Sequence, residues 1–279
     1  MWRVRKPSQL AVEVYQTCIG AVNDEDLKRR LEQVEVTIVQ EAQLYDVAAA
    51  QGKLHTLVRT RLIDGLVTVE EMSDLYSLRF AKQGSPGRGV YDELMSATRN
   101  GRCPLCGHGA VSTLDHFLPK SQYPCLSVLP LNLVPACMDC NKNKSRRFPR
   151  SPDEATLHPY FDDIEEDPWL GAQVLEGRPA AVRFSVKAVG CWDQVKQARV
   201  ERHFKLLKLA KLYTANAADE LVSIRENLRR IIRAGATGAV KEYLRAEAQS
   251  RSVARLNSWQ TAMYTALAES AWYCGGGFE

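Results

Sequence analysis

Residues 103–144 have the sequence CPLCGHGAVSTLDHFLPKSQYPCLSVLPLNLVPACMDCNKNK, and the rest of the chain is organised around them. This stretch holds two Cys-x-x-Cys pairs, Cys103/Cys106 and Cys137/Cys140, with 30 residues between Cys106 and Cys137. Each such turn can direct two thiolates at one ion, and two turns supply the four sulfurs of a closed tetrahedral zinc site. We therefore predict a structural Zn²⁺ ion that closes a small, loop-rich module.

Two other interpretations of the cysteines stay open. A single pair would also suit a redox dithiol, and two unrelated reduced pairs or a disulfide would show the same spacing, although reducing intracellular conditions disfavour a disulfide. His108 could replace one sulfur, but four thiolates already complete the shell, so we expect a solvated loop histidine there. The remaining cysteines are scattered, and we expect reduced thiols at Cys18, Cys125, Cys191 and Cys274.

A second group of polar residues lies between the two pairs. Asp115 and His116 follow an alternating run, 110–114, that predicts a short strand. Neighbours on a strand face opposite sides, so a shared site requires both to lie near its end. A carboxylate suits magnesium, and an imidazole with an ordinary pKa of about 6.5 can accept a proton from water. An isolated Asp-His pair is usually a solvated loop, but its place between two cysteine pairs favours a functional site.

Three further side chains complete this group. Asn132 opens a second apolar strand, and its amide can hydrogen-bond backbone across the loop. Asn141 begins a helix after the second cysteine pair and offers a neutral oxygen as a second metal ligand. Lys144 lies three residues further on, hence on the same helix face. For Lys144 a phosphate contact and an ordinary solvated position are equally open.

These residues, in this order, resemble the HNH endonucleases of the His-Me finger (ββα-metal) type. Asp115 and His116 match the first pair of that family, Asn132 its central asparagine, and Asn141 stands where the last histidine is usual. The resemblance implies a DNA endonuclease that hydrolyses phosphodiester bonds, nicking as a monomer, with His116 as general base. It also implies Asp115 and Asn141 as ligands of a catalytic ion, Asn132 as an orienting residue, and the cysteines as the zinc site. Asparagine at the last position favours Mg²⁺ or Mn²⁺ over softer ions.

The composition limits the partners of the 279-residue chain. Its net charge is only +4, so nucleic-acid binding would have to come from local clusters of cations. We expect contact with the DNA backbone from a set of cations, for which the alternative is an ordinary solvated face: Lys120, Lys142, Lys144, Arg146, Arg147 and Arg150. There is no apolar run of about 18 residues and no apolar signal core near Met1, so we expect a cytoplasmic protein without a membrane span.

We predict an α+β protein in which a small zinc-bound ββα-metal module is embedded between mainly α-helical regions. The expected parts are a helical accessory domain (1–82), a flexible linker (83–89), the nuclease module (90–163) and a mainly helical C-terminal domain (164–279). Apolar spacing and caps predict helices over 23–45, 54–62, 68–78 and 91–98, a strand over 182–186, and helices from about Trp192 onward, one of them after Asn216.

His158, in the sequence HPYFDD, is a possible auxiliary group of the nuclease site, and the alternative is an aromatic turn that packs the module. Two other functions compete with DNA cleavage: a non-catalytic zinc ribbon that binds DNA or protein, and an RNA-cleaving HNH enzyme. HNH proteins with helical flanks also resemble bacterial anti-phage defence nucleases, such as those of the Septu and Zorya systems. That resemblance implies other defence-system proteins as partners.

Overall fold

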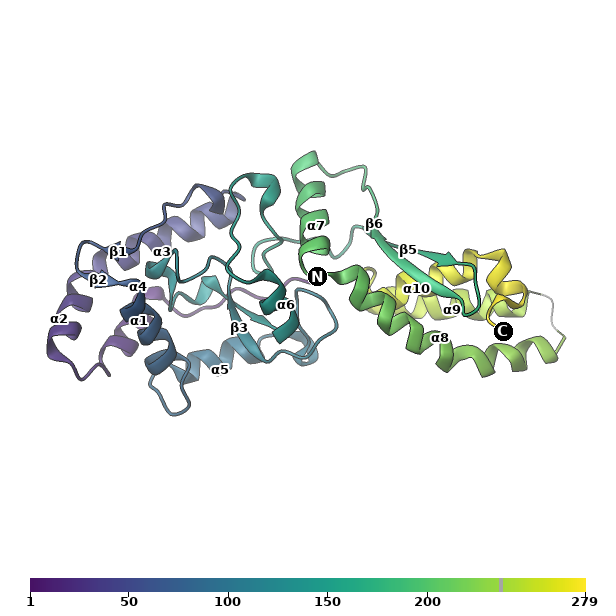
Figure 1. The fold of residues 1–279 in the computed structure, drawn as a ribbon, viewed down its shortest axis with the longest axis horizontal. Coiled ribbons are helices and arrows are strands. Elements are labelled where there is room, and N and C mark those ends of the chain that lie inside the picture. Colours follow the sequence, from purple (N-terminus) through teal and green to yellow (C-terminus); the bar gives the residue numbers. More distant parts are fainter. Residues whose placement is uncertain (236–237) are drawn as a thin grey trace. The chain divides into compact units, whose positions relative to one another are not determined.

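The chain folds into two units, Met1–Asp163 and Ile164–Glu279, in a computed structural model that describes residues 1–235 and 238–279 (Figure 1). Helices dominate both units, and each sheet in the described residues is an antiparallel pair of strands. The structure is therefore of the predicted α+β class. None of the helices within the described ranges is long and apolar enough to span a membrane.

The first unit begins with three helices, α1 (Ala11–Ile19), α2 (Glu25–Gln33) and α3 (Glu35–Ala50). The sequence predicts one long helix from Asn23, but the chain leaves helical geometry at Val34, whose φ and ψ are −91° and 2°. The cap is also one residue later than predicted, because the Asp24 side chain accepts a hydrogen bond from the backbone N–H of Leu27.

The predicted helix over 54–62 is wrong. A single 3-10 turn, η1 (Leu54–Thr56), is followed by an extended segment and a hairpin of β1 (Leu62–Ile63) with β2 (Val67–Thr68). The apolar spacing there does not mark a buried face, since Val58 is 80% exposed. The backbone N–H of Thr60 instead donates to the carbonyl of Gln122, 62 residues away in sequence, at 3.2 Å.

The capping box predicted before the next helix is present. The Thr68 hydroxyl accepts from the Glu71 N–H at 3.2 Å, and the Glu71 carboxylate accepts from the Thr68 N–H at 2.8 Å. These bonds satisfy two helix-end donors and begin α4 (Val69–Asp74), which continues as the π-helical turn η2 (Leu75–Phe80).

The segment predicted as a flexible linker is tied to the fold. The Gly87 N–H donates to the Arg79 carbonyl at 3.0 Å, and the Arg88 guanidinium donates to the Ala81 carbonyl at 2.7 Å. A Cβ atom at Gly87 would lie 2.8 Å from the Phe80 Cα, so the close approach requires glycine. The predicted helix that follows is present as α5 (Arg88–Ser96).

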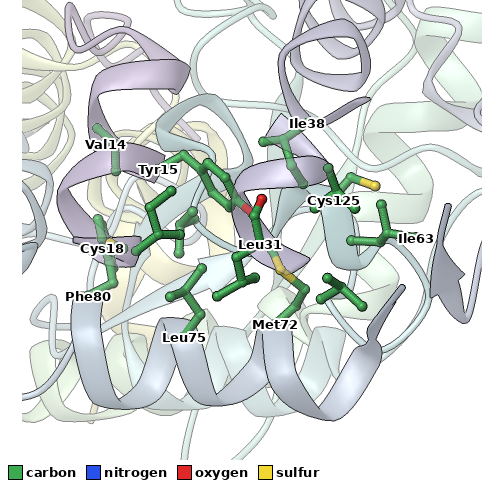
Figure 2. Close-up of a cluster of buried hydrophobic side chains, with 14 of the residues drawn as sticks. Val14, Tyr15, Cys18, Leu31, Ile38, Ile63, Met72, Leu75, Phe80 and Cys125 are labelled. Atoms are coloured by element: carbon green, nitrogen blue, oxygen red, sulfur yellow. The ribbon is translucent and has the colours of Figure 1, made fainter. Parts of the chain in front are cut away.

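One hydrophobic core joins the helical region to the cysteine-rich region (Figure 2). Tyr15 lies at its centre, fully buried, and its hydroxyl donates to the Leu31 carbonyl at 2.9 Å. Leu114, Cys125 and Leu133, from the cysteine-rich region, belong to the same cluster. Residues 1–82 and 90–163 thus share a core, and the helices act as a scaffold for the hairpin described below.

The second unit packs helices on a two-stranded sheet of β5 (Leu170–Leu175) and β6 (Ala181–Val186). Val182 and Phe184 of β6 are buried, as their alternation predicts, whereas β5 was not predicted. The helices of this unit are α7 (Gln194–Leu206), α8 (Leu209–Arg233), α9 (Ala239–Ala254) and α10 (Trp259–Glu269), followed by the turn η7 (Tyr273–Gly277). The predicted helix start at Asn216 is wrong, because α8 begins after Lys208, whose φ is +56°.

Candidate functional site

Four buried cysteines form the first part of the site. The sulfur atoms of Cys103, Cys106, Cys137 and Cys140 all lie within 4.8 Å of one another, and those of Cys106 and Cys137 are 3.9 Å apart. Sulfurs bound at about 2.3 Å to a tetrahedral zinc ion lie about 3.8 Å from one another. The cluster could therefore hold a zinc ion, as predicted, and His108 is not a member of it.

Backbone groups shape both cysteine turns. The Gly109 N–H donates to the Cys106 sulfur at 3.3 Å, and the Cys140 N–H donates to the Cys137 sulfur at 3.5 Å. Gly107 has a φ of +69°, and a Cβ atom at Gly109 would lie 2.9 Å from the Cys137 sulfur. The positive φ favours glycine at position 107, and the close approach of the Cys137 sulfur requires glycine at position 109.

The close approach of the thiols changes their acidity. Hydrogen bonding of the Cys140 thiol to the sulfurs of Cys103, Cys106 and Cys137 raises the pKa of Cys140 far above its usual range. Four sulfurs so close together cannot all be negative without a cation between them. Because thiolates are the ligands of zinc, binding of the ion would release the thiol protons.

A hairpin and a helix form the second part of the site. The strands β3 (Thr113–His116) and β4 (Leu133–Ala136) are antiparallel, and α6 (Met138–Lys144) packs against β3. The strand β3 begins later than the predicted run 110–114 and ends on His116. Asp115 and His116 therefore occupy the end of the strand, the position that a shared site requires.

The helix α6 covers the face of β3 that carries Thr113 and Asp115. The Asn141 amide donates to the Thr113 hydroxyl at 3.3 Å, and the Lys144 ammonium lies 3.0 Å from the Asp115 carboxylate. Residues two apart on a strand share a face, as do residues three apart on a helix. The structure thus brings Asp115, Asn141 and Lys144 together.

Lys144 is buried, which differs from both positions that the sequence leaves open for it, a phosphate contact and a solvated helix face. Its side chain and that of Asp115 are each only 5% exposed, and its ammonium also donates to the His116 carbonyl at 2.7 Å. Burial raises the pKa of Asp115 above its ordinary value, and the Lys144 charge opposes that shift. A buried carboxylate is costly unless it is paired, and Lys144 supplies the pair.

The imidazole of His116 is held in one orientation. Its Nε2 lies 2.9 Å from the Ser127 carbonyl, which can only accept, so Nε2 carries the hydrogen. The neutral ring then has its lone pair on Nδ1. Burial lowers the pKa of His116 to about 3, so the ring is neutral near pH 7. The Tyr76 ring meets the imidazole edge-on, with centroids 4.5 Å apart.

The buried amide of Asn132 ties the loop that follows His116. Its Oδ1 accepts from the Leu118 N–H at 2.8 Å, and its Nδ2 donates to the carbonyls of Leu118 and Leu126 at 3.0 and 3.1 Å. These are the cross-loop backbone bonds that the sequence predicts. They fix the loop that carries Ser127, and through it the orientation of the His116 ring.

His158 lies in an aromatic cluster and is buried. Its Nδ1 accepts from the Tyr160 N–H at 3.2 Å, and its Nε2 lies 2.9 Å from the Tyr45 hydroxyl. The ring also stacks on Phe117, with centroids 4.1 Å apart. Both nitrogens therefore bond protein groups, so this geometry matches the aromatic turn rather than the auxiliary role in catalysis.

The remaining predicted contact residues are spread over the first unit. The Lys120 ammonium lies 4.5 Å from the centroid of the Tyr76 ring, the same ring that meets His116. Lys142, Arg146 and Arg147 are exposed on and just after α6. Their contact with nucleic acid stays a prediction.

Comparisons with known proteins place the chain in a family. The fold and the site define an α+β protein with four buried cysteines that could hold a zinc ion. The chain is 33% identical to protein ea31 of Escherichia phage lambda over 254 residues, which cover 84% of this chain and 86% of that protein. It belongs to the same family as protein ea31. No family model and no solved structure matches the chain.

Replacing two of the clustered cysteines tests the zinc site. The double variant Cys137→Ser/Cys140→Ser leaves only two sulfurs, so we expect it to lose the bound zinc and the cooperative unfolding of the first unit. The expected cost is large because structural zinc contributes about 10–16 kcal/mol of apparent binding free energy in small zinc modules. Zinc content by elemental analysis and thermal unfolding by circular dichroism are the measurements.

The matched control is Cys191→Ser, an exposed cysteine outside the cluster, which should keep zinc and stability. Two results together would show that the cluster is not a zinc site: wild-type protein that contains no stoichiometric zinc after purification, and alkylation of all four clustered thiols.

A second prediction concerns the loop clamp. Asn132→Ala removes three buried hydrogen bonds and leaves the Leu118 N–H without its acceptor. We expect the free energy of unfolding to fall by about 2–4 kcal/mol, measured by urea denaturation with zinc present. The exposed Asn23→Ala should change it by less than about 0.5 kcal/mol. An equal fall in the free energy of unfolding for the two substitutions would show that Asn132 does not hold the loop.

Proposed function

We propose that this protein is a divalent-metal-dependent endonuclease that hydrolyses phosphodiester bonds in DNA. In this proposal β3, β4 and α6 form a ββα-metal module of the HNH type, and the four cysteines form its structural zinc site. The observation that supports it best is the His116 ring, whose Nε2 is committed to the Ser127 carbonyl. That bond leaves Nδ1 as the nitrogen able to accept a proton.

The donor set of Asp115 and Asn141 suits a hard cation. Asp115 offers carboxylate oxygens, and Asn141, whose Nδ2 bonds Thr113, keeps its Oδ1 for a ligand role. Oxygen donors are those that Mg²⁺ and Mn²⁺ prefer. When bound, such an ion would polarise the scissile phosphate and stabilise charge on the leaving oxygen.

The protein's own residues carry the remaining chemistry. Nδ1 of His116 would take a proton from the water that attacks phosphorus. Burial holds the pKa of the ring at about 3, which keeps it neutral but weakens it as a base, and the Ser127 carbonyl opposes that shift by stabilising the charged ring through Nε2–H. Asn132 positions this carbonyl by holding its loop. Lys144 neutralises Asp115 while the carboxylate is buried, and the pair keeps β3 and α6 together.

A non-catalytic zinc ribbon accounts for fewer of these features. A ribbon needs the two cysteine turns and their glycines, but it needs neither a histidine fixed in one tautomer nor a buried Asp115–Lys144 pair. DNA and RNA both carry the phosphodiester bond, so parallel digestion of the two decides between the DNA-cleaving and RNA-cleaving forms of the enzyme. A role in anti-phage defence stays a prediction from resemblance alone.

His116→Ala tests the proposed base. General-base catalysis contributes about 10²–10⁴-fold, so we expect the variant to nick supercoiled plasmid at least 100-fold more slowly than wild type in Mg²⁺. Zinc content and circular dichroism should be unchanged. His108→Ala, a histidine outside the cysteine cluster, is the matched control and should keep the wild-type rate.

Two results would contradict the proposal. Nicking by His116→Ala at the wild-type rate would show that His116 is not the general base. Wild-type protein that carries zinc but cleaves neither DNA nor RNA in Mg²⁺ or Mn²⁺ would favour the ribbon.

Asn141→Ala tests the metal ligand. The side chain is half-buried and makes one long hydrogen bond, so the fold should tolerate the change. We expect the Mg²⁺ concentration for half-maximal nicking to rise about tenfold or more, because one of two protein ligands is lost. Met138→Ala, at an exposed position of the same helix, should leave it within about twofold. A Mg²⁺ requirement unchanged in Asn141→Ala would exclude Asn141 as a ligand.

A further inference from the structure

The first unit contains a cavity of about 820 Å³ that the proposed chemistry does not use. Its walls come from residues 55–61, 121–123 and 146–150, segments far apart in sequence. Four arginines line it and no carboxylate does: Arg59, Arg61, Arg146 and Arg150. Its volume lies in the range of ligand pockets, about 300–1,000 Å³.

Hydrogen bonds and a ring contact hold the walls together. The Thr60 N–H donates to the Gln122 carbonyl at 3.2 Å, and the Gln122 amide donates to the Arg146 carbonyl at 3.3 Å. The Arg59 guanidinium lies 5.0 Å from the centroid of the Phe148 ring. These contacts link all three segments, so the cavity is a built feature of the fold.

The cations of this cavity lack acidic partners. All four guanidiniums are exposed, and none forms an ion pair with a described carboxylate, whereas arginines of α2 and α5 do. The carboxylate of Glu154 accepts from the Arg150 backbone N–H, but Glu154 does not line the cavity. Like charges gathered without partners repel one another, and an anion relieves the repulsion. Arginine forks also match phosphate geometry.

We propose that this cavity binds the phosphate backbone of a DNA strand, as a contact separate from the scissile position. The inference rests on the proposed function, because it concerns the strand that His116 would cut. Two walls extend elements of the candidate site: residues 121–123 belong to the loop that Asn132 clamps, and residues 146–150 directly follow α6. The cavity and the candidate site are therefore built from adjoining segments of the first unit.

The test measures binding without cleavage. In the His116→Ala protein with Mg²⁺, the affinity for a fluorescein-labelled DNA oligonucleotide is measured by anisotropy over a range of salt concentrations. The substitutions Arg59→Ala and Arg61→Ala are added together. We expect binding at least tenfold weaker, and a salt slope smaller by about 1–2, since each lost phosphate contact removes about 0.7–0.9. Both arginines are exposed, and circular dichroism checks the fold.

A charge-matched control separates this site from bulk charge. Lys28→Ala with Arg29→Ala removes two cations from α2, which does not line the cavity, and should weaken binding less than twofold. Equal affinity of the two double variants, or no DNA binding by the His116→Ala parent, would overturn the inference. If Arg59→Ala/Arg61→Ala loses binding while wild type fails to nick plasmid, the cavity stands as a DNA site and the nuclease proposal fails.

Discussion

Closure of one loop by four sulfurs is the constraint on which the cysteine-rich region depends. A hairpin of two four-residue strands, such as β3 and β4, is marginal by itself in water. The cysteine cluster joins the chain before β3 to the chain after β4, so the strands cannot separate without breaking it. A bound ion would make that closure part of the folding free energy.

The hairpin has two further supports besides the sulfurs. Leu114 of β3 and Leu133 of β4 are buried in the core built by the N-terminal helices, and the Asn132 amide holds the loop between the strands. Each support acts on a different part of the same 30-residue segment. Together they explain how a region with little regular structure presents Asp115 and His116 in one arrangement.

The parts of the structure that sequence predicts well are those with local causes. Cysteine spacing, the Thr68 capping box and the alternation of β6 each follow from residues a few positions apart. The failures arise from distant partners. Thr60 bonds Gln122, which keeps extended a segment whose apolar spacing predicts a helix, and Lys144 is buried because α6 packs on the face of β3 that carries Asp115. No periodicity within either segment contains that information.

Contacts between residues distant in sequence also make the N-terminal helices part of the surroundings of His116. Tyr76, from the π-helical turn η2, packs its ring against His116, and Tyr45 of α3 bonds His158, which stacks on Phe117 beside it. Tyr76, from the region predicted as an accessory domain, thus contacts the imidazole directly, and Tyr45 reaches Phe117 through His158. Whatever chemistry His116 performs, the orientation of its ring depends on those helices as well as on the hairpin. All the contacts described for the candidate site therefore lie within the first unit, Met1–Asp163.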